Sequence, residues 1–291
     1  MATTAAGIIF SNLHDGNLPE LTRIRTMSSV PFGCRYRFID FALSNMVHSG
    51  ITNVNVITHN SYQSLMDHLG SGKDWDLARR SGGLRILPPF VSAEASKVGL
   101  YRTRLEALRS MVDVIGKMQE DVVVMTDCDV LCNIDLSEVI KRHVESGAKM
   151  TIVVTSMYLT PEKAPHETEV ISDADGYVRE FIASPTDVGR TVDVTTNIVI
   201  SDRQFFYNAV KEAQARGYTS VSKHLVPLHA PKGYIKVYKY NGFYADITSM
   251  ADYFASSMSI LNKENRDALI GIKERPILTK VRNSAPTKYI D

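Results

Sequence analysis

The sequence predicts an α/β domain with a mainly parallel sheet that helices cover on both faces. The first observation is a set of short apolar runs, at 7–10, 53–58 and 122–126, which are typical of buried strands. The second is a set of helical patterns with one apolar face, of which 38–47 and 102–117 are the clearest. Because alternating strands and helices form crossover connections, this order favours parallel pairing.

The second half of the chain carries more strand signals than the first. Strand patterns dominate from 170 to 200, and Asp175-Gly176 is typical of a hairpin turn. Both patterns continue towards the C-terminus, with helices expected at 136–145, 202–215, 220–226 and 249–261 and strands at 151–156 and 234–240.

Composition excludes several functional classes. The chain has 291 residues, a net charge of +1 and a hydrophobic content of 44%, so neither a nucleic-acid partner nor a membrane partner is implied. No apolar run reaches the ~20 residues of a membrane helix, and the N-terminus lacks the pattern of a signal peptide. Cys34, Cys128 and Cys132 lack zinc-site spacing and are interpreted as reduced thiols of a cytoplasmic protein.

The stretch from Val30 to Gly50 organises the chain. It begins as a loop, becomes a helix and has a plausible helix stop at Gly50. Arg35 and Arg37 come just before the helix, as an anion site would require. A core helix preceded by solvated arginines is the alternative, and composition alone favours it.

This stretch resembles bacterial glucose-1-phosphate adenylyltransferase, also called ADP-glucose pyrophosphorylase. The resemblance continues through Gly70–Leu77 and Leu87-Pro88-Pro89 and covers essentially the whole chain. Within the family, it is strongest to the GlgD-type subunit, a companion of the catalytic GlgC-type subunit. It implies a Rossmann-like nucleotidyltransferase domain over 1–262. The remaining 263–291 would then be a connector towards a left-handed β-helix domain that this chain lacks.

Active relatives join ATP and glucose 1-phosphate into ADP-glucose and pyrophosphate for glycogen biosynthesis, with magnesium. Their phosphate-binding loop reads Gly-Gly-x-Gly-x-Arg, whereas this chain reads Asn12-Leu-His-Asp-Gly-Asn17. Asn17 stands at the arginine position, and Asp15 adds a negative charge where a polyphosphate would lie. Met27 replaces a lysine and cannot supply a cation. These departures count against ATP binding in the usual mode.

The metal site implied by the resemblance is also degraded. Its first aspartate aligns with Cys128, a poor ligand for a hard cation, although the flanking Asp127 or Asp129 could replace it after a one-residue shift. Asp246 matches the second aspartate. The alternatives are turn and cap roles for Asp127 and Asp129, and a structural hydrogen bond for Asp246. The sugar-site Glu-Lys pair is replaced within 182–185.

The sequence therefore predicts a catalytically silent or feeble subunit that forms a hetero-oligomer with a GlgC-type partner and modulates it. No cofactor is certain, and magnesium is expected only with residual activity. Arg25 and Arg37 are predicted to bind a regulatory anion such as a sugar phosphate, with ordinary surface arginines as the alternative. Two other functions stay open: a divergent nucleotidyltransferase that uses Asp127 or Asp129 with Asp246, and a stand-alone sugar-phosphate sensor.

Overall fold

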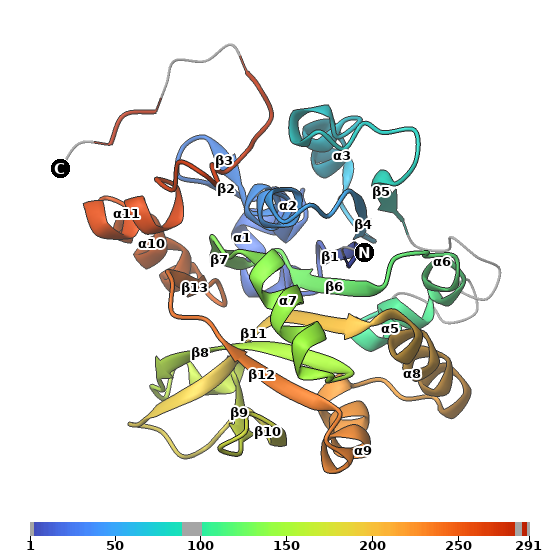
Figure 1. Ribbon diagram of the computed structural model, residues 1–291. Coiled ribbons are helices and arrows are strands. Elements are labelled where there is room, and N and C mark those ends of the chain that lie inside the picture. The colour runs from blue at the N-terminus through green and yellow to red at the C-terminus, as the bar shows by residue number, and fades with distance from the viewer. Residues whose placement is uncertain (1–2, 89–100, 283–286, 290–291) are drawn as a thin grey trace. The chain divides into compact units, whose positions relative to one another are not determined.

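The computed structural model describes residues 3–88, 101–282 and 287–289 (Figure 1). The chain forms two compact units. Unit 1 comprises 1–5, 89–125 and 137–241, and unit 2 comprises 6–88, 126–136 and 242–291. Pro89 of the Leu87-Pro88-Pro89 match lies outside the described residues.

Unit 2 contains three parallel neighbouring strands. β1 (Ala5–Phe10) pairs with β4 (Asn53–Ile57), and β4 pairs with β5 (Gly83–Leu87). This parallel order is the one that the alternation of apolar runs and helices predicts. The other elements of unit 2 are α1 (Pro19–Thr22), β2 (Pro31–Phe32), β3 (Tyr36–Arg37), α2 (Phe38–His48), α3 (Gln63–Leu69), β7 (Val130–Cys132), β13 (Tyr244–Asp246), α10 (Met250–Ser259) and α11 (Lys263–Leu269).

Helix α2 is the predicted helix of the organising stretch, and the predicted helix stop at Gly50, two residues after its last turn, is confirmed. Gly50 has φ +76°, and its N–H donates to the carbonyl of Val47 at 3.0 Å. The N-terminal turn holds Asp40, which is fully buried and accepts from His68 Nε2 at 2.6 Å. The His68 ring also packs edge-on against Trp75, which is fully buried.

Unit 1 is built on a mixed sheet. Strand β11 (Thr191–Asp202) runs antiparallel to β6 (Val122–Asp127, of which the last two residues belong to unit 2), β8 (Met150–Tyr158) and β9 (Thr168–Ser172), whereas β12 (Ile235–Lys239) runs parallel to β8. β9 and β10 (Val178–Ala183) form an antiparallel hairpin. Gly176 in its turn has φ +80°, as the Asp175-Gly176 pattern predicts. The helices of unit 1 are α5 (Arg104–Arg109), α6 (Val112–Gly116), α7 (Leu136–Ser146, of which Leu136 belongs to unit 2), α8 (Arg203–Arg216) and α9 (Val226–His229).

The prediction of a continuous helix over 102–117 is wrong. Two short helices, α5 and α6, take its place. The break falls at Ser110 and Met111, where the Ser110 hydroxyl donates to the carbonyl of Ala107 at 2.6 Å and Met111 leaves the helical region at φ −114°, ψ 11°. Helix α5 is in turn fixed to the segment after α8, because Thr103 Oγ1 donates to the carbonyl of Thr219 at 2.5 Å. A local side-chain bond and packing thus override the apolar periodicity.

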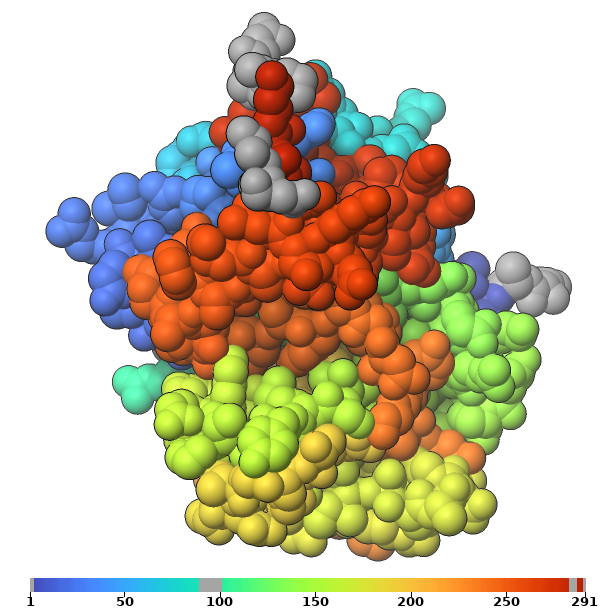
Figure 2. All heavy atoms as spheres, turned by 90° about the vertical axis from the view of Figure 1, so that its left-hand side faces the viewer, coloured from blue at the N-terminus to red at the C-terminus, as the bar shows by residue number. Residues whose placement is uncertain are grey.

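The α/β fold predicted from the sequence is confirmed, with its parallel strands concentrated in unit 2. The predicted connector begins with α11, which belongs with α10 to the orange and orange-red surface in Figure 2. Its residues then run along α2, where Leu278 N donates to Ser44 Oγ at 2.8 Å and His48 Nε2 to the carbonyl of Pro276 at 2.7 Å. Its role as a connector to a further domain stays a prediction. Among the described residues, no helix combines the length and apolarity needed to cross a bilayer.

A buried histidine in unit 1 generates a pH prediction. His143 of α7 is 3% exposed, shares a 2.8 Å hydrogen bond with Thr151 Oγ1, and burial lowers its pKa from 6.5 to about 4. The unfolded state therefore binds more protons between pH 6.5 and 4, so stability falls as the pH drops through that window, by about 2–3 kcal/mol.

We expect His143→Gln to flatten this part of the stability profile, because glutamine does not titrate. Urea unfolding at several pH values between 4 and 7 measures it, with the same series on exposed His166→Gln as the control. An unchanged slope in the His143 variant would contradict the prediction.

Candidate functional site

The candidate site of unit 2 lies where two strands end. The loop 11–18 leaves β1, and the bend at 128–129 follows β6. Carboxyl ends of strands are where open α/β sheets place their ligand sites. Both segments carry ionisable side chains: His14 and Asp15 on the loop, and Asp127 and Asp129 at the end of β6.

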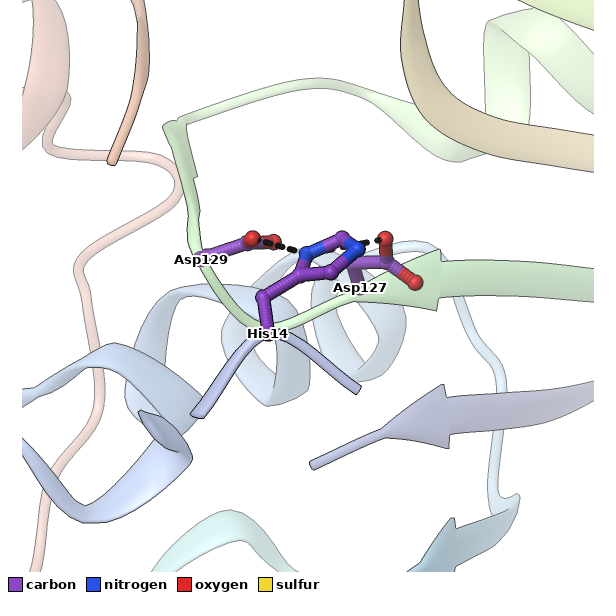
Figure 3. A group of neighbouring side chains, drawn as sticks. All are labelled: His14, Asp127 and Asp129. Carbon is purple, nitrogen blue, oxygen red and sulfur yellow. Dashed lines mark hydrogen bonds and ion pairs between the residues drawn. The ribbon is translucent and has the colours of Figure 1, made fainter. Parts of the chain in front are cut away.

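His14 lies between two carboxylates, as Figure 3 shows. Its Nδ1 donates a short hydrogen bond to Asp129 and lies 3.8 Å from an oxygen of Asp127. One ligand atom from each of the three side chains falls within 4.8 Å of the others. Both carboxylates are about 2% exposed, whereas the His14 side chain is 30% exposed. The group is therefore buried on its acidic side and accessible through the imidazole ring.

Two backbone N–H groups of this loop, those of Ser11 and Asn17, and two beside it, those of Met27 and Ser28, are engaged within unit 2. Ser11 N donates to the carbonyl of Ile57 at 3.0 Å, and Ser28 N to that of Ser11 at 3.1 Å. Asn17 N donates to the carbonyl of His14 at 2.9 Å, and Met27 N to Asp15 Oδ1 at 2.6 Å. A phosphate-binding loop offers such donors to its ligand, but here they bind the protein itself.

The loop becomes more negatively charged as the pH rises, because the carboxyl group of Asp15 loses its proton. Burial raises the pKa of its carboxyl from 3.8 to about 7, although the N–H of Met27 and the charge of His14 act in the opposite direction. Near neutral pH this group is therefore partly charged. It gains a full negative charge above that range, next to the place where a polyphosphate would need positive groups.

Cys128, where the resemblance puts the first metal-binding aspartate, is turned away from the acidic group. Its thiol donates to the carbonyl of Ser11 at 3.3 Å. Burial raises the pKa of this thiol well above 9, and the charges of Asp129 and Asp127 raise it further. It stays protonated and is not a ligand for a hard cation. Met27, at the lysine position, is also in the core, with 1% exposure.

Asp246 lies on a strand that is hydrogen-bonded to the segment after β6, but it is not part of the group formed by His14, Asp127 and Asp129. Its strand β13 pairs antiparallel with β7, so that Asp246 faces Val130, and Ile247 N donates to the carbonyl of Asp129 at 3.1 Å. The structure therefore brings Asp127 and Asp129 together with His14. The carboxylate of Asp246 is not among the atoms within 4.8 Å of one another.

The predicted anion site has a third arginine. Arg37 is half-buried, and its Nη1 donates to the carbonyl of Ser64 at 2.7 Å and to the Ser64 hydroxyl at 2.9 Å. Burial lowers the pKa of Arg37, and the positive charges of Arg282 and Arg25 lower it further. Arg37 is thus close enough to Arg282 and to Arg25 to be repelled by each, whereas the charges of Asp40 and Asp67 act in the opposite direction.

Sequence reasoning missed His14 and Arg282. His14 stands in the segment that replaces the glycine-rich loop, in which the sequence indicated a role only for Asp15 and Asn17. An imidazole in place of the glycine-rich pattern could have indicated that this loop carries a proton- or metal-binding group. Arg282 gives no comparable signal, because it is 245 positions from Arg37 and lies in an irregular segment.

Known proteins share this arrangement of the chain. A family model described as nucleotidyl transferase matches residues 16–263. A glycogen biosynthesis protein GlgD of Bacillus subtilis is 29% identical over 284 residues, which cover 97% of this chain and 71% of that protein. A glucose-1-phosphate adenylyltransferase of Pseudothermotoga lettingae is 29% identical over 256 residues, which cover 87% of this chain and 60% of that protein.

Among solved structures, a putative glucose-1-phosphate thymidylyltransferase from Bacillus anthracis, crystallised with a sucrose, superposes with a TM-score of 0.69. The two chains are 16% identical, and the match covers 88% of this chain and 95% of the other, so it supports the fold alone. The predicted resemblance to GlgD-type proteins is confirmed by the curated relatives. With a family model that matches most of its length and a fold that agrees, this chain belongs to the nucleotidyl transferase family.

Proposed function

We propose that this chain is a catalytically silent subunit that assembles with, and modulates, an active glucose-1-phosphate adenylyltransferase subunit in glycogen biosynthesis. The proposal rests mainly on the loop after β1, where His14 is held by Asp129 and Asp15 accepts from Met27 N. Two N–H groups of the loop donate to protein carbonyls and Asp15 adds a carboxyl group, although the loop stands at the position of the phosphate-binding loop in active relatives. The three free cysteines fit a cytoplasmic, reducing setting.

The size of the expected loss of catalytic rate favours a chain without activity over a weakly active one. Nucleotidyl transfer depends on charge stabilisation at the α-phosphate, and removal of one preorganised donor typically costs roughly 100- to 1000-fold in rate. Here the glycine-rich loop, its arginine, the lysine before Val30 and the sugar-site pair are all replaced. A divergent enzyme that uses Asp127 or Asp129 with Asp246 is the alternative, because Ile247 N ties β13 to Asp129.

The proposed function is tested by comparing the chain with and without an active partner. Purified chain with magnesium, ATP and glucose 1-phosphate should form no ADP-glucose above background. Co-expression with a GlgC-type subunit should give a stable complex whose saturation curve differs from that of the partner alone. Robust turnover by the isolated chain would favour the divergent enzyme. If no complex forms and the chain still binds sugar phosphates tightly, it is a stand-alone sensor.

A direct prediction concerns nucleotide binding. Because Asp15, Asp127 and Asp129 repel a polyphosphate, and two N–H groups of the loop already bind the protein, we expect no saturable Mg–ATP binding below about 1 mM. Isothermal titration calorimetry measures it, with an active GlgC-type subunit as the positive control. Micromolar binding of Mg–ATP to this chain would contradict the prediction.

A second prediction concerns the arginines. We expect Arg25→Ala with Arg37→Ala to abolish the response of the complex to sugar phosphates or inorganic phosphate, because together they remove two of the three clustered guanidinium groups. Basal partner activity should change less than twofold. Enzyme assays over a series of effector concentrations measure the response. Because coupling between two binding sites is reciprocal, substrate bound to the partner should also change the affinity of the complex for the effector.

The matched control for the arginine pair is Arg79→Ala with Arg80→Ala, two exposed arginines of the same unit. Arg37→Lys is a second variant that keeps a positive charge and so separates charge from the bond to Ser64. If the double variant responds to effectors as the unmodified complex does, the anion site lies elsewhere. If it fails to assemble, the two arginines are structural.

A further inference from the structure

The three-residue group at the ends of β1 and β6 carries an inference that does not depend on the proposed function. Asp127 and Asp129 are nearly fully buried, and each has an oxygen within 4.8 Å of the other and of His14 Nδ1. Two carboxylates at this separation repel each other, and burial strengthens the repulsion because water screens it less. Within the group, a protonated imidazole would supply one positive charge against two carboxylates.

A divalent cation neutralises the two carboxylates of this group better than a proton on His14 does. With the ion on Nδ1, in the place of the proton now shared with Asp129, two positive charges balance two carboxylates and the imidazole is neutral. The geometry favours this nitrogen, because Nδ1 is the atom that lies near both carboxylates. The 30% exposure of the His14 side chain leaves the group open to solvent for entry of an ion.

The chemistry of the donors selects the class of ion. Magnesium and calcium take oxygen ligands, whereas imidazole favours zinc and other transition metals. Three protein ligands leave at least one position for water or another ligand. We propose that His14, Asp127 and Asp129 form a binding site for a divalent transition-metal ion of the Zn²⁺ class. Bound there, the ion joins the loop 11–18 to the end of β6 and stabilises this part of unit 2.

This site is not the magnesium site that the resemblance implies. It uses a histidine of the replaced loop, it omits Asp246, and Cys128 at the aligned position points to Ser11. The two expectations can fail separately. Tight Mg–ATP binding and turnover would overturn the silent subunit without testing zinc, and absence of zinc binding would leave the silent subunit unaffected.

The test uses the full chain without a histidine tag, first treated with a chelator and then titrated with Zn²⁺ by calorimetry. We expect one tight site per chain, and elemental analysis after dialysis should find the same stoichiometry. His14→Asn and, separately, Asp129→Asn should each weaken this site roughly 100-fold, because each removes a direct ligand. His48→Asn is the matched control, since it removes a half-buried histidine of the same unit that binds the carbonyl of Pro276.

A readout on the unmodified protein keeps the test valid if a variant fails to fold. In protein labelled with ¹⁵N-histidine, one equivalent of Zn²⁺ should shift the Nδ1 resonance of a single histidine, and this shifted signal should be missing from His14→Asn. The proposal is overturned if zinc does not bind, if it binds equally to His14→Asn and the unmodified chain, or if the shifted resonance belongs to another histidine. In those cases His14 serves only as the internal counter-charge of the two carboxylates.

Discussion

The buried polar face of helix α2 is the constraint on which unit 2 depends. Asp40 and Ser44 are fully buried and Asn45 is 6% exposed, and each holds a segment distant in sequence. Asp40 binds His68, Ser44 accepts from Leu278 N at 2.8 Å, and Asn45 donates to the carbonyl of Cys132 at 3.1 Å while accepting from Ile134 N at 3.2 Å. Loss of one such partner leaves a buried polar group unpaired, at a cost of about 1–3 kcal/mol. Because Asn45 holds the end of β7, α2 also helps to position the bend that carries Asp129.

The candidate site combines a familiar framework with altered charge. The chain has the fold of a nucleotidyl transferase, in which the ends of β1 and β6 carry the candidate site. On this framework the positive groups expected near phosphates are replaced by Asn17 and Met27, and the loop is bound to the acidic end of β6 through His14. The proposed silence towards nucleotides and the proposed binding of a small cation are compatible, because negative charge at one place opposes the first ligand and favours the second. Arg37, by contrast, is close to the positive charges of Arg282 and Arg25, where we propose that an anion binds.

Local sequence patterns predicted the elements well where local and tertiary preferences agree. The strands at 53–57 and 122–127, the helix from Phe38 and the turn at Gly176 follow from apolar runs, periodicity and glycine at a positive φ. The helix over 102–117 was mispredicted because its apolar periodicity continues through Ser110 and Met111. In the structure, the Ser110 hydroxyl and the bond from Thr103 to Thr219 set the direction of the chain instead. Such contacts outweigh propensities of less than 1 kcal/mol per residue.

The sequence by itself determined the fold class, the family resemblance and the loss of phosphate-binding groups, since these depend on residue types at fixed spacings along the chain. It also indicated Asp127 and Asp129, because carboxylates after a buried strand fall at the ligand-binding edge of a sheet. Only the tertiary structure decided that His14 meets them, that Cys128 turns away and that Arg282 joins Arg37. The physical reason is separation: His14 and Asp129 are 115 positions apart, and no local periodicity specifies which distant side chains packing will bring together.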